Sequence, residues 1–75
     1  MAATNVEEFQ LEGSDYIELK SLLKAAGLVE TGGEAKAAIT DGLVQVNGAV
    51  ETRKANKIRA GMTVTFNQQS VKVVS

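Results

Sequence analysis

A chain of 75 residues is long enough for one domain and no more. Its hydrophobic fraction of 44% and charged fraction of 23% are those of an ordinary globular protein, and its apolar runs are far too short to span a membrane. The absence of cysteine and histidine excludes disulfides, thiolate metal sites and the usual bases and nucleophiles of neutral pH. We therefore expect a cytoplasmic protein with no catalytic role, no metal site and no cofactor.

The net charge of −1 conceals an uneven distribution of charge along the chain. Residues 1–18 carry five acids and no base, whereas residues 19–75 carry all eight bases and four acids. Binding partners respond to the local field rather than to the total charge. The second stretch is therefore the one that could bind a polyanion.

The N-terminal stretch is weakly patterned. Residues 6–11 could supply a short edge strand, and Gly13-Ser14-Asp15 is typical of a turn. We expect residues 1–15 to form a weakly structured acidic segment and residues 16–75 to form a single domain.

Two short helices are predicted next. An apolar stripe with helical spacing begins near Glu18, and Gly27 should close this first helix. The second helix should start at Thr31, a good N-cap residue for which Glu34 completes a capping box, and it should end at Gly42. The stripes consist of Leu19, Leu22, Leu23 and Ala26 in the first helix and of Ala35, Ala38 and Ile39 in the second. The small residues of the second stripe indicate that the two helices pack closely.

From Leu43 onward the apolar residues alternate, as in strands. Residues 43–46 and 49–51 flank Asn47-Gly48, which is a strong hairpin signal. Two further strands are expected at 62–66 and 71–74, with turns at 60–61 and 67–70. This order predicts an α+β fold in which two short, packed helices cover one face of a small, mostly antiparallel sheet.

The ordered set of motifs resembles a known family. The motifs are Leu19–Leu23, Gly27-Leu28, Thr31-x-x-Glu34-Ala35-Lys36, Ile39, Gly42 and Val44-x-Val46-Asn47-Gly48. Together they resemble the RNA-binding domain first seen in small-subunit ribosomal protein S-four, with its αL motif of helix, loop and helix. In particular they are similar to the small stand-alone bacterial type called YbcJ-like or YaaA-like. The resemblance covers residues 16–66.

The resemblance implies a bacterial, non-catalytic protein that binds structured RNA of the ribosomal or transfer type. It also implies a protein that acts as a monomer and could associate with the ribosome.

Two groups of residues could carry this binding. Glycine costs about 1 kcal/mol inside a helix, so Gly32-Gly33 could present bare N–H groups to a phosphate, or could merely let the two helices approach. The loop from Arg53 to Arg59 holds four bases and no acid, which is typical of phosphate contacts but also of a solvated loop. The predicted RNA-binding residues are Thr31, Gly32, Gly33, Lys36, Asn47, Arg53, Lys54, Lys57 and Arg59, with Lys20 and Lys24 as lesser candidates. With only three aromatic residues, we expect no platform on which unpaired bases could stack.

A protein–protein adaptor is the alternative function. A C-terminal strand containing Val71, Val73 and Val74 could offer an edge for strand addition, and the acidic N-terminal segment could engage a basic partner. Salt distinguishes the two functions, because phosphate contacts weaken steeply as salt rises whereas strand addition barely responds.

Overall fold

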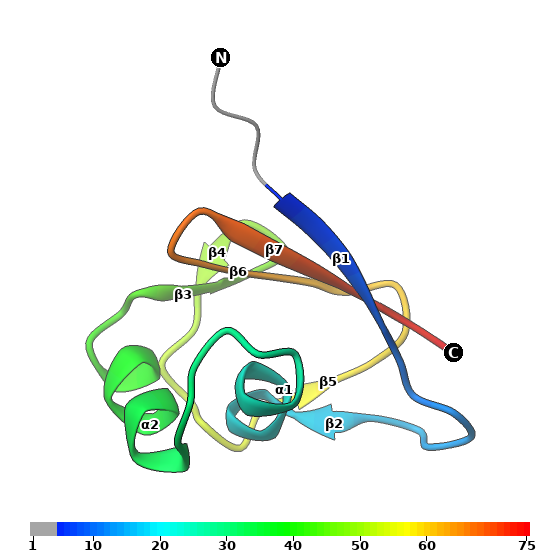
Figure 1. Cartoon of the computed structure of the whole chain (residues 1–75), viewed down its shortest axis with the longest axis horizontal. Coiled ribbons are helices and arrows are strands. Elements are labelled where there is room, and N and C mark those ends of the chain that lie inside the picture. The colour runs from blue at the N-terminus through cyan, green and yellow to red at the C-terminus, as the bar shows by residue number, and fades with distance from the viewer. Residues whose placement is uncertain (1–4) are drawn as a thin grey trace.

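The computed structural model describes residues 5–75, so residues 1–4 of the predicted acidic segment lie outside the described part. Five strands form the main sheet in the order β1-β7-β6-β3-β4, and two more form a separate ladder, β2-β5. The elements are β1 (Asn5–Gln10), β2 (Ile17–Glu18), α1 (Leu19–Ala25), α2 (Gly32–Thr40), β3 (Val44–Val46), β4 (Ala49–Val50), β5 (Lys57–Ile58), β6 (Thr63–Phe66) and β7 (Gln69–Val74). Both helices and the β2-β5 ladder lie on the same side of the main sheet (Figure 1).

The predicted fold class is confirmed. The pairs β3-β4, β3-β6 and β6-β7 are antiparallel, and only β1-β7 is parallel. The core lies between the sheet and the helices, where leucines of α1 and Ile39 of α2 meet valines of β3, β6 and β7. Its fully buried large side chains are Leu19, Leu22, Leu23, Ile39, Ile58, Val44, Val64, Val71 and Val73.

Both helices end as predicted, at a glycine in the left-handed region. Gly27 has a φ of 78°, and the N–H of Leu28 donates to the carbonyl of Leu23 at 2.9 Å. Gly42 has a φ of 76°, and the N–H of Leu43 donates to the carbonyl of Ala38 at 3.0 Å. These bonds satisfy carbonyls that the helix ends would otherwise leave unpaired.

The start of α2 differs in one detail from a capping box. The Thr31 hydroxyl accepts the N–H of Glu34 at 3.1 Å, as predicted. The Glu34 carboxylate, however, accepts the N–H of Glu30 at 2.9 Å, one residue before the N-cap. The Glu34 carboxylate therefore fixes the backbone of the residue before the N-cap. In a standard capping box it would accept the N–H of the N-cap residue itself.

The turn before β7 is shorter than the sequence suggested. A turn was expected at 67–70, but only Asn67 and Gln68 connect the strands, and Phe66 already pairs with Gln69. Both turn residues have positive φ, 53° and 65°, as a two-residue turn between twisted strands requires. Glutamine seldom adopts this conformation, so a two-residue turn could not be predicted from these residues.

The strand β7 lies inside the sheet, between β1 and β6. Its backbone is therefore paired on both sides, so the C-terminal edge that the adaptor alternative requires is already occupied by β1. The predicted division at residue 16 stays a prediction, although β1 pairs with β7 over all six of its residues. Within residues 5–75, no helix has the length and apolarity needed to cross a membrane.

Candidate functional site

The loop of residues 53–59, here called the basic loop, and the C-terminal end of α2 border an open hollow of about 610 Å³. Thr40 of α2 and residues 52–57 line it, and three of these residues are cationic: Arg53, Lys54 and Lys57. No carboxylate is among the lining residues. The hollow therefore combines a positive field with two threonine hydroxyls, a chemistry suited to an anionic group such as a phosphate.

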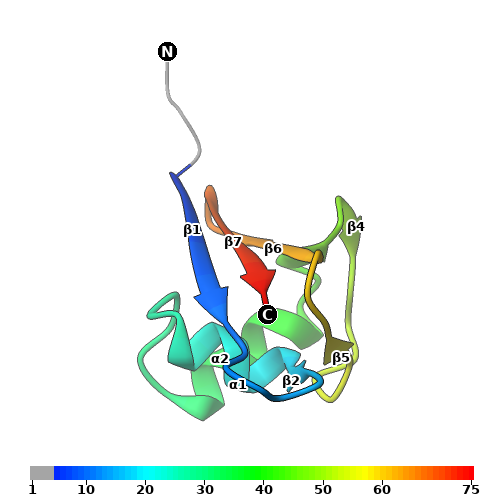
Figure 2. The same ribbon diagram turned by 90° about the vertical axis from the view of Figure 1, so that its right-hand side faces the viewer.

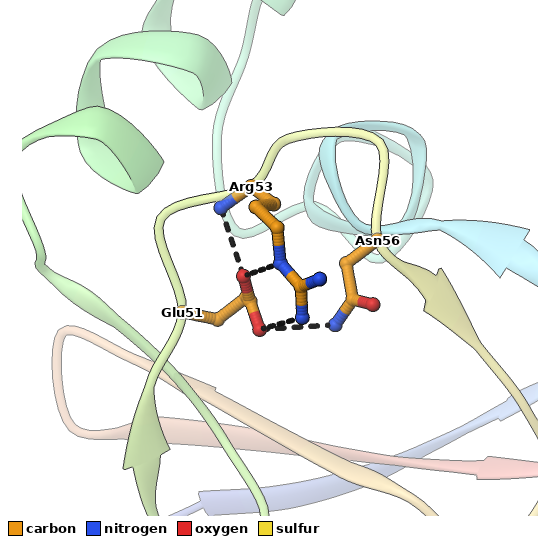
Figure 3. Close-up of polar contacts among 3 residues, drawn as sticks. All are labelled: Glu51, Arg53 and Asn56. Atoms are coloured by element: carbon orange, nitrogen blue, oxygen red, sulfur yellow. Dashed lines mark hydrogen bonds and ion pairs between the residues drawn. The ribbon is translucent and has the colours of Figure 1, made fainter.

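A single carboxylate holds the loop in shape (Figure 3). The Glu51 side chain accepts the Nε–H of Arg53 at 2.9 Å, the backbone N–H of Arg53 at 2.9 Å and the Nδ2–H of Asn56 at 3.3 Å. The Glu51 side chain is only 15% exposed, whereas that of Arg53 is 76% exposed. Glu51 therefore lies behind the loop as a brace, and Arg53 faces solvent.

This contact changes the acidity of both partners. The side-chain hydrogen bond from Arg53, followed by that from its backbone N–H, lowers the pKa of Glu51 below its ordinary value of 4.5. The same side-chain bond raises the pKa of Arg53. Glu51 is therefore ionised at neutral pH, and it neutralises part of the charge of Arg53.

The first turn of α1 fixes the other side of the loop. The N–H of Leu19 donates to the carbonyl of Asn56 at 2.9 Å, and that of Lys20 to the carbonyl of Lys54 at 3.1 Å. These are N–H groups that the start of a helix leaves without an internal partner. Since Glu18 makes no side-chain cap, the loop carbonyls take its place, and the loop is held against α1.

A row of residues along α2 leads to Thr40, the one residue of this helix among those that line the hollow. Lys36 and Gly32 precede Thr40 by four and eight residues, so the three lie in a row along the helix. Lys36 is exposed and stands one turn from Thr40. Lys36 is not among the residues that line the hollow, so its part in binding stays a prediction.

The entrance of α2 lies at the far end of that row. The helix spans about 13 Å between Thr31 and Thr40, so Thr31, Gly32 and Gly33 do not line the hollow. The carboxylate of Glu34 lies beside them. A Cβ atom added to Gly32 or Gly33 would meet nothing within 4 Å, so close packing of the helices does not account for either glycine.

Asn47 also lies away from the hollow, at the hairpin turn. Its side-chain oxygen accepts the N–H of Thr63 at 2.9 Å, and its own N–H donates to the carbonyl of Thr63 at 2.8 Å. With a φ of 52° it also shapes the turn. Of the lesser candidates, Lys20 adjoins the loop through its backbone, and Lys24 stands one turn further along α1.

The acidic strand lies on the other side of the molecule. In the sheet order β1 and β4 are the two edges, and the basic loop follows β4. Figure 2 shows β1 at one side and the connection from β4 to β5 at the other. Glu7 and Glu8 of β1 are exposed there, away from the basic loop, whereas Glu18 lies opposite Lys57, which lines the hollow.

Comparison with known proteins identifies the family. A family model described as the S4 domain matches residues 9–74. The chain belongs to the S4 domain family. The Escherichia coli (strain K12) protein named Putative RNA-binding protein YbcJ is 52% identical over 67 residues, which are 89% of this chain and 96% of that protein. The Shigella flexneri protein named Uncharacterized protein YbcJ matches with the same identity and coverage.

A solved structure of a relative agrees with the fold. The solution structure of YbcJ from E. coli, described as revealing an αL motif involved in RNA-binding, has a TM-score of 0.74 and 48% sequence identity. The match covers 100% of this chain and 95% of that one. The predicted resemblance, including the αL motif, is confirmed.

The S4 domain has one cluster that sequence reasoning missed. Tyr16 is 40% exposed. The Lys57 Nζ lies 5.1 Å from the centroid of its ring, and the Arg59 Cζ lies 5.6 Å from it. The β2-β5 ladder brings them together. It was not predicted, because β5 lies within residues 53–59, which were expected to form a loop. Within residues 5–75, no group of three histidine, cysteine or acidic residues could hold a metal ion.

Proposed function

We propose that this S4 domain binds the phosphate backbone of structured RNA, of the ribosomal or transfer type, at the hollow between the basic loop and α2. The observation that carries the proposal is the position of Arg53, Lys54 and Lys57 around one hollow, at the opposite side of the molecule from the acidic strand. RNA as the ligand is supported by the name of the E. coli relative and by the description of its structure, which has an αL motif involved in RNA-binding.

The loop is suited to grip phosphate because it is ordered before the ligand arrives. Glu51 and the first turn of α1 hold its backbone from two sides, so binding need not order the loop at full entropic cost. Lys54 stands at the corner of the turn closed by the N–H of Asn56 and the carbonyl of Arg53. Its ammonium group is exposed at the rim and can neutralise a phosphate without reading sequence.

Lys36 would extend the contact along α2, and the entrance residues Thr31, Gly32 and Gly33 would meet a more distant phosphate of the same RNA. Asn47, Lys20 and Lys24 are outlying members of the proposed surface. The protein would act without catalysis, as a cytoplasmic monomer, and its structured ligand would allow association with the ribosome.

The test compares two lysines of equal charge. Lys54→Ala removes a cation from the hollow, whereas Lys72→Ala removes one from β7, beside Glu8 of the acidic strand. Binding of a fluorescently labelled RNA stem-loop is titrated by anisotropy over a series of salt concentrations. We expect Lys54→Ala to weaken binding and to reduce the log–log salt slope by roughly 0.9, the value for one phosphate contact on a duplex.

Lys72→Ala should change neither quantity. If the two variants bind equally well, the hollow is not the binding surface. If the wild-type protein binds no stem-loop and its binding to any partner is insensitive to salt, the RNA proposal itself is wrong and a protein partner is favoured.

A further inference from the structure

The contact of Tyr16 with two cations has a structural basis in the β2-β5 ladder. Ile17 pairs with Ile58 in antiparallel register, so Tyr16 falls opposite Arg59 at the next position. Ile58 is fully buried, and Lys57 and Arg59 on either side of it therefore point outward. The register thus places one aromatic ring and two long basic side chains on the same exposed face.

The cluster also adjoins the hollow. Lys57 both lines the hollow and lies over the Tyr16 ring. Arg59 lies over the same ring but does not line the hollow. The ring therefore contacts one cation that lines the hollow and one that does not.

The two kinds of cation at this surface are held differently. Arg53 is bound by the Glu51 carboxylate, which cancels part of its charge. Lys57 and Arg59 rest on a neutral ring, which orients a cation but leaves its full charge available. Glu18 lies opposite Lys57 in the ladder, yet no ion pair joins them among the residues that the structure describes.

We propose that Tyr16 holds Lys57 and Arg59 as a paired clamp for a second RNA phosphate, next to the one bound in the hollow. This inference rests on the proposed RNA-binding function. Lysine and arginine side chains lose much rotamer entropy when they are ordered. A ring that restricts both before RNA arrives lowers that cost, so Tyr16 is a positioning residue for the two cations.

The experiment separates the ring from the hydroxyl. Tyr16→Phe keeps the ring and should bind the labelled RNA stem-loop as the wild type does. Tyr16→Leu removes the ring and should weaken binding by about two- to fivefold, the range of an exposed cation–π contact. Tyr16→Met is a second variant without a ring, and thermal melting establishes that each variant is folded.

A double-mutant cycle decides whether the ring acts through the cations. In a Lys57→Ala/Arg59→Ala protein, Tyr16→Leu should have no further effect on affinity, because nothing remains for the ring to position. If Tyr16→Leu still weakens binding in that background, the ring contacts RNA directly and the clamp is wrong. If Tyr16→Leu leaves wild-type affinity unchanged, the clamp is also wrong, while the effect of Lys54→Ala still tests RNA binding at the hollow.

Discussion

Glu51 shows how one residue can organise a binding loop while opposing its charge. Its carboxylate accepts hydrogen bonds from Arg53 and Asn56 and so fixes the curve of the loop. It also pairs with one of the three cations of the hollow. Glu51 therefore fixes the shape of the loop but neutralises part of the charge of Arg53. Lys54 and Lys57 provide the unpaired positive charge.

The lowered pKa of Glu51 predicts how this brace depends on pH. Because the folded protein holds the Glu51 pKa below its ordinary value of 4.5, the ionised carboxylate stabilises the folded state. That contribution is fully present above about pH 4.5 and is lost as the pH falls through the lower pKa of the folded protein. Glu51→Gln removes it, so the difference in Tm between wild type and variant should be constant near neutral pH and should shrink in acid.

Thermal melting from neutral to acidic pH measures this difference. Asp41→Asn is the matched control, since Asp41 is an exposed acid outside the loop. A difference between the wild type and Glu51→Gln that persists unchanged into acid would show that Glu51 stabilises the loop through contacts other than its charge.

At the scale of elements, the entrance of α2 carries two glycines that packing does not require. Both have open space at the Cβ position, and neither has a positive φ. Alanine is therefore compatible with both positions, and glycine costs the helix stability. A ligand that approaches the backbone is a reason to keep them.

Replacing Gly33 tests this reason. Gly33→Ala should stabilise the fold by up to about 1 kcal/mol, which raises the Tm of a domain of this size by a few degrees. If a phosphate rests on the bare backbone there, the same variant should bind the RNA stem-loop less tightly. Melting and anisotropy together report both effects.

Gly33→Glu is a second test for a phosphate at the entrance of α2. A carboxylate in the first turn of a helix is favourable to the helix, so the variant should melt no lower than the wild type while repelling a phosphate. If both variants bind RNA with unchanged affinity, the entrance of α2 lies outside the binding surface.

The elements that the sequence predicted best are those with local signals. The helix caps at Thr31, Gly27 and Gly42 and the Asn47-Gly48 hairpin each depend on a few adjacent residues, and all four are present. The parallel pairing of β1 with β7 and the β2-β5 ladder depend on partners far apart in the chain. Alternation within one strand does not specify its partner, so neither pairing could be predicted.

The same distinction holds for the candidate site. The run of bases from Arg53 to Arg59 is visible in the sequence, and the structure gathers three of its cations at the hollow. The contribution of Thr40 and the contact with Tyr16 depend on the tertiary fold. The entrance of α2 does not line the hollow, because the length of the helix separates it from Thr40.

At the scale of the whole molecule, the main sheet separates Glu7 and Glu8 of β1 from the basic loop. The acidic strand β1 and the connection that leads from β4 into the basic loop lie at opposite edges. A nearly neutral protein can in this way present a positive face to a polyanion. The position of β1 also gives it a structural role, since it covers one side of β7.

Removing β1 tests that role. A chain beginning at Leu11 would lose the half-buried Phe9 and the backbone bonds of the β1-β7 pair. We expect a loss of roughly 2 kcal/mol or more, equivalent to a fall in Tm of about 8–16 °C. The uncovered edge of β7 should also promote self-association, which sedimentation can measure.

Glu7→Gln/Glu8→Gln is the control, because it removes the charges and keeps the strand. That variant should keep the oligomeric state of the full chain and a nearly normal Tm. A chain beginning at Leu11 that melted like the full chain would instead support a domain boundary near residue 16.

The pairing of β1 with β7 also bears on the time at which the protein can fold. The ribosome synthesises β1 first among the described strands and β7 last, so β1 has no partner until β7 has been translated. The helices and the Asn47-Gly48 hairpin can form earlier, since their contacts are local. Because β7, which lies between β1 and β6, is the last of the described strands to arrive, the pairing of β1 with β7 should be a late event in folding.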